Sequence, residues 1–107
     1  MSNLTIIVDD NAVYLDGGVL SGLDLSPANI PSNIHALQWK SNIGWIEFRM
    51  KEDFTQDPNQ IINALPDWAN TCVNIFNVQV EANKKAAEEQ QAAAIANQPR
   101  TTGTTVI

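Results

Sequence analysis

The sequence has few of the residues on which most catalytic and metal sites depend. It contains one cysteine, Cys72, and one histidine, His35, among 107 residues. A single cysteine excludes an internal disulfide and a metal cage built from several cysteines. No nucleophile motif surrounds either residue, and no glycine-rich phosphate-binding motif is present. We therefore expect a non-enzymatic protein with no catalytic residues, no metal and no cofactor.

Basic residues are also scarce, because six lysines and arginines stand against twelve acidic residues and leave a net charge of -6. Such a chain repels a phosphate backbone, which argues against nucleic acid as a partner. No apolar run approaches the roughly 18 residues of a membrane span, and residues 1–4 lack a signal-peptide pattern. We expect a protein without a membrane partner that stays in the cytoplasm where it is made.

The remaining candidates for chemistry have structural interpretations. Cys72 faces the core of a predicted helix, where a cysteine acts as a small buried hydrophobe. His35 begins a predicted strand after a proline-containing loop, and its ring is expected to satisfy backbone groups of that loop. Four aspartates stand at predicted turns, where aspartate accepts hydrogen bonds from nearby backbone; they are Asp9, Asp10, Asp16 and Asp24.

The first half of the chain predicts strands. Apolar and β-branched runs at 4–8 and 12–15 surround a tight turn, and prolines at 27 and 31 then impose a loop. Residues 34–39 and 43–50 predict a hairpin centred on residues 41 and 42. Alternation in its second strand places Ile46, Phe48 and Met50 on one face, with Trp45 as the apolar exception on the polar face.

The second half predicts helices. Asp57 and Pro58 are typical of a helix start, and Pro66 would end this short helix. Asp67 is then placed to cap a second helix from Trp68 to about residue 97. Two adjacent apolar stripes at helical spacing indicate that its first three turns lie across a sheet; they are Trp68, Cys72, Ile75 and Gln79, and Ala69, Val73, Phe76 and Val80.

These elements predict an α+β fold, in which a small antiparallel sheet of four or five strands is packed by a C-terminal helix that extends beyond the core. The expected organisation is a single domain over residues 1–80, with strands within about 4–50 and helices within about 58–80. A helical extension rich in Ala, Glu and Gln follows over 81–97, and then a flexible tail over 98–107.

The extension has high helix propensity but little to bury, so it is either a solvated helix or a surface for another helix. Alanines 82, 86 and 93, near heptad spacing after Ile75, would permit the close approach of another helix, including that of a second copy in a homo-oligomer. Trp39 and Trp45 stand on neighbouring strands and serve either cross-strand packing or binding. The candidate protein-binding residues are Trp39, Trp45, Ile75, Ala82, Ala86, Ala93 and Ile95.

Residues 30–39 read Ile-Pro-Ser-Asn-Ile-His-Ala-Leu-Gln-Trp, and residues 44–48 read Gly-Trp-Ile-Glu-Phe. Together with the segments at 9–13 and 21–25, they resemble a family of small bacteriophage proteins associated with tail fibres, regarded as fibre-assembly or chaperone-like proteins. The resemblance covers roughly residues 4–80. It implies a non-catalytic viral protein that binds a tail or tail-fibre protein, either during fibre folding or as a retained part of the virion tail.

Overall fold

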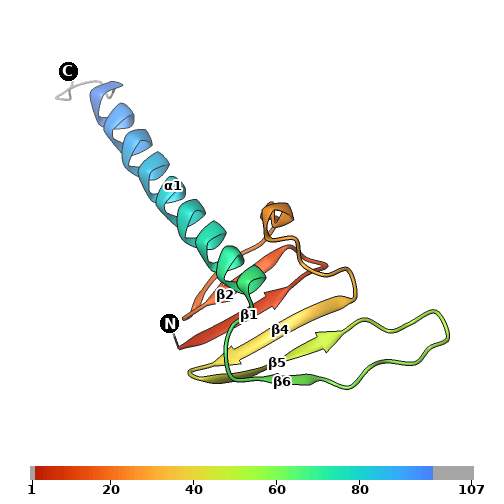
Figure 1. Ribbon diagram of the computed structural model, residues 1–107. Helices are drawn as coiled ribbons and strands as arrows, with labels where there is room; N and C mark the ends of the chain where they lie inside the picture. The colour runs from red at the N-terminus through yellow and green to blue at the C-terminus, as the bar shows by residue number, and fades with distance from the viewer. Residues whose placement is uncertain (1, 98–107) are drawn as a thin grey trace. The chain divides into compact units, whose positions relative to one another are not determined.

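The structure, a computed structural model, describes the backbone of residues 2–97 and the side chains of residues 2–90. Its centre is one antiparallel sheet in the order β3-β2-β1-β4-β5-β6 (Figure 1). The strands are β1 (Asn3–Ile7), β2 (Ala12–Leu15), β3 (Gly18–Leu20), β4 (Ile34–Lys40), β5 (Ile43–Phe48) and β6 (Gln60–Ile62). A short 3-10 helix, η1 (Ser26–Ala28), and the helix α1 (Asp67–Asn97) complete the described elements. The predicted α+β class is confirmed, with six strands in the sheet.

Two three-stranded antiparallel units, β1-β2-β3 and β4-β5-β6, and one long connection produce this strand order. β4 and β5 are joined by two residues, as predicted, and Ser41 takes the positive φ of 60° that two-residue hairpin turns require. Residues 21–33, which include η1, carry the chain from β3 at one edge back to β4, which pairs with β1. The pairing of β1 with β4 therefore joins the two three-stranded units into one sheet.

The prediction of a short helix from residue 58 is wrong, because this segment contains the edge strand β6. Ile61 and Ile62 are β-branched residues, which suit a strand, and they pair with Trp45 and Gly44 of β5. Pro66 leaves too few residues for a helix that would bury an apolar face. Pairing with β5 instead satisfies the backbone groups of both strands.

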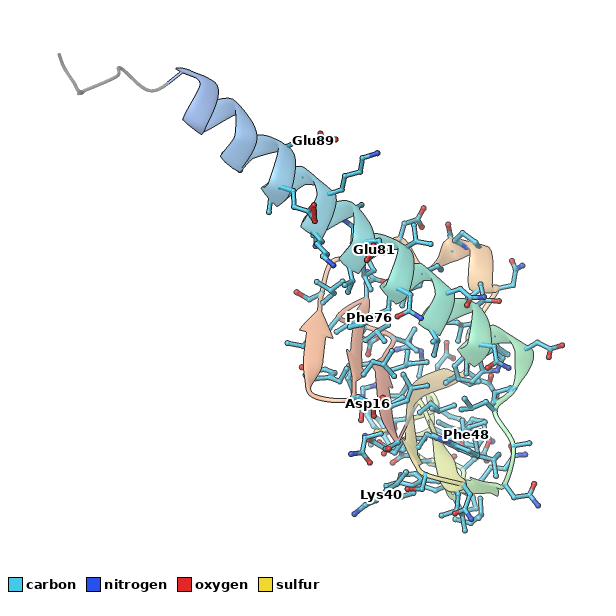
Figure 2. All side chains as sticks on the ribbon, turned by 90° about the vertical axis from the view of Figure 1, so that its left-hand side faces the viewer. Asp16, Lys40, Phe48, Phe76, Glu81 and Glu89 are labelled. Atoms are coloured by element: carbon cyan, nitrogen blue, oxygen red, sulfur yellow. The ribbon has the colours of Figure 1, made fainter. Side chains whose placement is uncertain are left out.

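The hydrophobic core lies between one face of the sheet and the first turns of α1. Leu4, Ile6 and Leu37 point into it from β1 and β4 and are fully buried. The helix contributes Ala69, Cys72 and Phe76, all buried; Figure 2 shows Phe76 on the sheet side of the helix. Other predicted stripe residues, including Trp68, Val73 and Ile75, are half-buried against this core, whereas Val80 is exposed.

Asp67 is the first residue of the helix α1. It therefore belongs to the first helical turn, whereas the sequence predicted that it precedes the helix as a cap. The Pro66 carbonyl accepts hydrogen bonds from the backbone N–H groups of Ala69 and Asn70, at 3.0 and 3.2 Å. The acidic side chain of Asp67 therefore lies where the helix dipole favours negative charge. Within residues 2–97, no helix combines the length and the apolar character that crossing a membrane requires.

The chain separates into two compact units, residues 1–77 and residues 78–107. The first contains the sheet, η1 and the packed turns of α1. The described part of the second is the remainder of α1, which is helical through Asn97 as predicted. The expected flexible tail, 98–107, lies outside the described residues.

Candidate functional site

The face of the sheet opposite the core carries one continuous row of side chains across all six strands. The strand register places the members of this row opposite one another in the order Val19, Tyr14, Thr5, Gln38, Trp45 and Ile61. We call these six residues the open row. Because side chains alternate between the two faces of a strand, all six point away from the core.

The ends of the open row are apolar and exposed. Tyr14 is 46% exposed and Val19 is 53% exposed at one end, and Trp45 and Ile61 are 38% and 66% exposed at the other. They form two exposed apolar pairs on neighbouring strands, separated by the polar middle of the row, and exposed apolar groups rimmed by polar residues are typical of protein-binding surfaces. The open row is therefore the strongest candidate site among the described residues.

The middle of the open row is polar and internally bonded. Thr5 Oγ1 donates a hydrogen bond to Gln38 Oε1 at 2.7 Å. Trp45 Nε1 donates to the Glu47 carboxylate at 2.9 Å, which holds the indole against its own strand. A shallow hollow of about 300 Å³ lies over this region, lined in part by Thr5, Gln38 and Trp45. The row thus presents one hydrogen-bonded indole beside a small hollow.

Only some of the predicted binding residues reach this surface. Trp45 belongs to the open row, as the alternation in β5 predicted. Trp39 is 9% exposed and packs in the core, as the cross-strand packing interpretation predicts, and it also lines the hollow. Its ring packs beside Gly44, which leaves it the space it needs. Ile75 is half-buried and packs against the core with part of its side chain.

The other candidate binding residues belong to the helical extension, which is part of the second unit of the chain. Ala82 and Ala86 are exposed on α1. Ala93 and Ile95 lie outside the residues whose side chains are described. The larger exposed groups on this part of α1 are Val78 and Val80.

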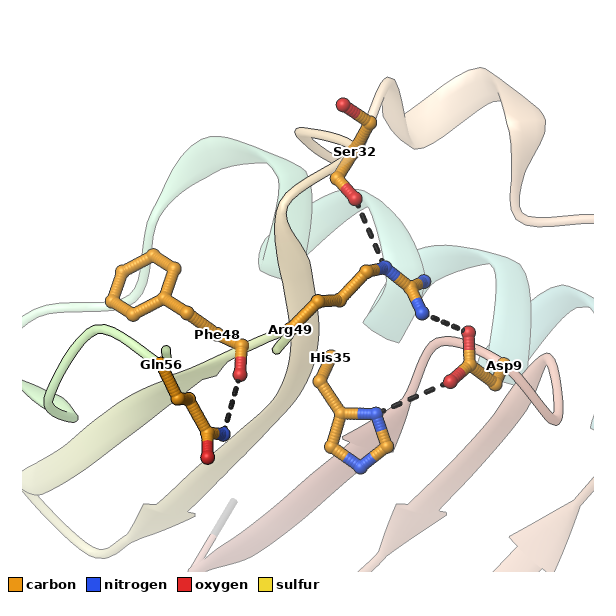
Figure 3. Close-up of polar contacts among 6 residues, drawn as sticks. All are labelled: Asp9, Ser32, His35, Phe48, Arg49 and Gln56. Atoms are coloured by element: carbon orange, nitrogen blue, oxygen red, sulfur yellow. Dashed lines mark hydrogen bonds and ion pairs between the residues drawn. The ribbon is translucent and has the colours of Figure 1, made fainter. Parts of the chain in front are cut away.

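A polar cluster at the end of the sheet joins the β1–β2 turn to the end of β5 (Figure 3). Arg49 Nη1 donates to Asp9 Oδ1, and Arg49 Nε donates to the Ser32 carbonyl at 2.9 Å. His35 Nδ1 lies 3.2 Å from Asp9 Oδ2. The expectation that His35 bonds loop backbone is wrong, because its ring contacts the carboxylate instead. The cluster links three segments that are distant in the sequence.

The hydrogen bond from Arg49 holds the pKa of Asp9 below its ordinary value of 3.8, with a further contribution from the charge of Arg49 and from His35. A lowered pKa in the folded state means that the unfolded chain binds more protons in acid. The stabilisation by Asp9 is therefore complete above its unfolded pKa and is lost as the pH falls through the folded pKa.

The lowered pKa of Asp9 predicts how the unfolding free energy depends on pH. We expect wild-type protein to lose more unfolding free energy between pH 6 and pH 3 than Asp9→Asn, because the variant has no carboxylate to protonate. Urea denaturation at several pH values measures the difference. Asp10→Asn, at the next position of the same turn, is the matched control, and an equal loss in wild type and Asp9→Asn would contradict the assignment.

Two other predicted turn aspartates also accept hydrogen bonds from backbone. Asp16 accepts hydrogen bonds from the backbone N–H groups of Ser2 and Asn3, both at 2.8 Å, and these bonds lower its pKa. Asp24 accepts from the hydroxyl and the backbone N–H of Ser26, with the same effect on its pKa. Only Asp24 bonds its own turn, as predicted. Asp16 instead ties its turn to the start of β1, and Asp9 likewise bonds residues that are distant in the sequence.

Cys72 is fully buried, as predicted, and burial raises the pKa of its thiol to about 11. A buried thiol that remains protonated is a poor nucleophile and packs as a hydrophobe. Within residues 2–97, no three His, Cys, Asp or Glu side chains gather in a way that holds a metal ion.

The sequence interpretation missed most of the open row. Tyr14 lies between Val13 and Leu15, both of which turn toward the core, so strict alternation in β2 predicts its outward direction. Ile61 was missed because its segment was predicted to be a helix. Tyr14 and Ile61 lie in one row with Trp45 because of the pairing register between the strands, which alternation alone does not give.

Comparison with protein-family models, with curated proteins and with solved structures finds no match for this chain.

Proposed function

We propose that this chain is a non-catalytic bacteriophage protein that binds a tail or tail-fibre protein and acts in fibre folding or assembly in the host cytoplasm. The observation that carries the binding role is the open row, which holds Tyr14, Trp45 and Ile61 exposed on a rigid sheet. Tyrosine and tryptophan are the residues that most often dominate binding energy in protein interfaces. The phage context comes from the resemblance of residues 4–80.

The charge of the chain favours a particular kind of partner surface. The outward positions of the strands carry two charged residues, Lys40 and Glu47, one on each side of the open row. The chain as a whole has a net charge of -6. A partner surface with an acidic group opposite Lys40 and a basic group opposite Glu47 would match this pair, and the net charge of the chain favours a partner that is basic overall.

Co-expression with the tail-fibre protein of the same phage tests the proposal. The double variant Tyr14→Ser, Trp45→Ser is expected to bind the fibre protein about 30-fold more weakly or worse, because it removes two exposed aromatic contacts. Its thermal unfolding should stay close to wild type, since neither side chain lies in the core. Binding is measured by co-purification and calorimetry.

Val78→Ser is the control, because Val78 is 70% exposed on α1 and lies outside the sheet face. Fibre trimers that form equally well without the chain, together with no co-purification, would remove the assembly role. Unchanged binding by the double variant would show that the open row is not the binding surface.

A second function is favoured by the exposure of Val78 and Val80 on α1. In this alternative, the chain is a structural part of the virion tail that docks through its long helix, or it self-associates through residues 75–96. Mass spectrometry of purified particles separates the roles, because a retained part is present in fixed stoichiometry and a transient helper is absent. A chain truncated after Val80 that keeps its oligomeric state in light scattering would exclude self-association.

A further inference from the structure

The segment between β5 and β6 is a long, internally bonded loop that extends beyond the end of the sheet (Figure 1). Lys51 N–H donates to the Thr55 carbonyl at 2.7 Å, and Phe54 N–H donates to the Lys51 carbonyl at 3.0 Å. Gln56 Nε2 donates to the Phe48 carbonyl at 2.7 Å, which fastens the loop to β5 (Figure 3). These bonds connect the loop to itself and to β5.

Phe54 lies in the tight turn of this loop, and both its exposure and its backbone conformation are unfavourable for folding. Its side chain is 84% exposed, the highest value among the large apolar residues described. Its φ of 66° lies in the left-handed region, which a residue with a Cβ adopts at a cost. Glycine at this position would remove both penalties. Folding alone therefore gives no reason for a phenylalanine here.

Acidic groups surround the exposed ring in the sequence and leave the loop with excess negative charge. The Asp53 carboxylate accepts hydrogen bonds from the Thr55 N–H and hydroxyl at 3.1 and 2.6 Å, which keeps it in place beside Phe54. Lys51 forms an ion pair with Asp57 at 3.1 Å. Glu52 and Asp53 remain as the negative charges next to the ring.

We propose that Phe54 is a preformed anchor that inserts into an apolar pocket with a basic rim on a partner protein. A rigid aromatic side chain loses little conformational entropy on binding, and a prearranged loop lowers the remaining cost. Glu52 and Asp53 would meet lysine or arginine at the rim of that pocket. This inference rests on the proposed function only in that the chain binds another protein.

A second copy of this chain is a poor receptor for the anchor. The larger of the two described hollows, about 380 Å³, is lined by Asp24 and by Asn11, Ser26 and Asn29, beside several apolar groups. An acidic loop approaching Asp24 would be repelled. The smaller hollow, about 300 Å³, is lined by Trp39, Lys40 and Trp45 and is the place where a second copy would receive the ring. The net charge of -6 on each copy opposes their approach, so we assign the receptor to a different protein. An adduct between position 54 and this hollow of a second copy would overturn that assignment.

Phe54→Gly separates a binding role from a structural one. We expect this variant to melt a few degrees (~2–5 °C) higher than wild type, because it relieves the left-handed strain. We expect it to bind the tail-fibre protein about 30-fold more weakly, as loss of a central aromatic contact does. Ser41→Gly is the matched control, since Ser41 also has a positive φ and lies in the β4–β5 turn.

Ser41→Gly should gain stability and keep full binding. Full binding by Phe54→Gly would overturn the inference while leaving the proposed function in place. A lower melting temperature for Phe54→Gly would also overturn it, because the ring would then serve the fold.

A second measurement does not depend on the identity of the partner. p-Benzoyl-phenylalanine replaces Phe54 in one chain and Met50, which is also exposed in this loop, in another, and both are irradiated in the cells that naturally contain the chain. We expect position 54 to give one dominant adduct, mapped by mass spectrometry to an apolar pocket with lysine or arginine at its rim. No adduct above that of position 50, or an adduct on an acidic or flat surface, would overturn the inference. A mapped pocket on a protein unrelated to fibres would support it and refute the proposed function.

Discussion

Gly44→Ala is expected to destabilise the protein severely, lowering the unfolding free energy by about 3 kcal/mol or more. An ideal Cβ at Gly44 would lie 2.1 Å from the Gln38 carbonyl oxygen and 3.0 Å from the Cα and Cε3 of Trp39. Relief of this contact requires the backbones of β4 and β5 to separate, because a carbonyl oxygen cannot rotate away as a side chain end does. Since small domains have total stabilities of about 5–15 kcal/mol, a loss of this size unfolds much of the population in mild denaturant.

Urea denaturation followed by tryptophan fluorescence measures this effect, and Gly18→Ala supplies the control. A Cβ at Gly18 would meet the Cζ of Phe76 at 3.3 Å, so that this ring would have to move by a few tenths of an ångström, and the Leu15 carbonyl oxygen at 3.4 Å, which is ordinary contact. We expect Gly18→Ala to change the unfolding free energy by about 1 kcal/mol or less. Similar effects of the two substitutions would show that Gly44 is not needed for close approach of the strands.

Phe76→Ala is expected to lower the unfolding free energy by about 3–5 kcal/mol, the usual range for removal of a buried aromatic ring. Phe76 is 7% exposed and reaches from α1 to the β3 edge of the sheet, where Gly18 leaves room for its ring. Its loss leaves a cavity between helix and sheet that rigid strands cannot close. Phe76→Leu should cost less, because it retains part of the buried volume.

The control for this prediction is Val78→Ala, two residues further along the same helix. Val78 is 70% exposed, so its truncation should change stability by about 0.5 kcal/mol or less. Chemical denaturation of the three variants gives the comparison. A small effect for Phe76→Ala would mean that α1 contributes little to the core, contrary to the burial of its first turns.

Local sequence patterns predicted the parts of the fold that depend on a few neighbouring residues. Alternation gave the direction of the side chains of Trp45 to Phe48 in β5, because successive residues of a strand face opposite sides. It failed for Met50, which lies beyond the end of β5 and is exposed. The helical spacing of apolar residues after Pro66 gave α1 and the face that it buries. The scarcity of histidine and cysteine limited the kinds of catalytic or metal site to be expected. The edge strand β6 was missed because a capping pattern at Asp57 and Pro58 competed with strand propensity over only three residues.

The amino-acid sequence by itself determined the α+β class, the β4–β5 hairpin, the extent of α1 and the burial of Cys72, since each follows from local periodicity and turn chemistry. Only the tertiary structure decided that Trp39 packs inside while Trp45 faces out in line with Tyr14 and Ile61. That arrangement depends on the register between strands brought together from distant parts of the chain, which no local pattern specifies. The pairing of Asp9 with Arg49 and the exposure of Phe54 have the same origin.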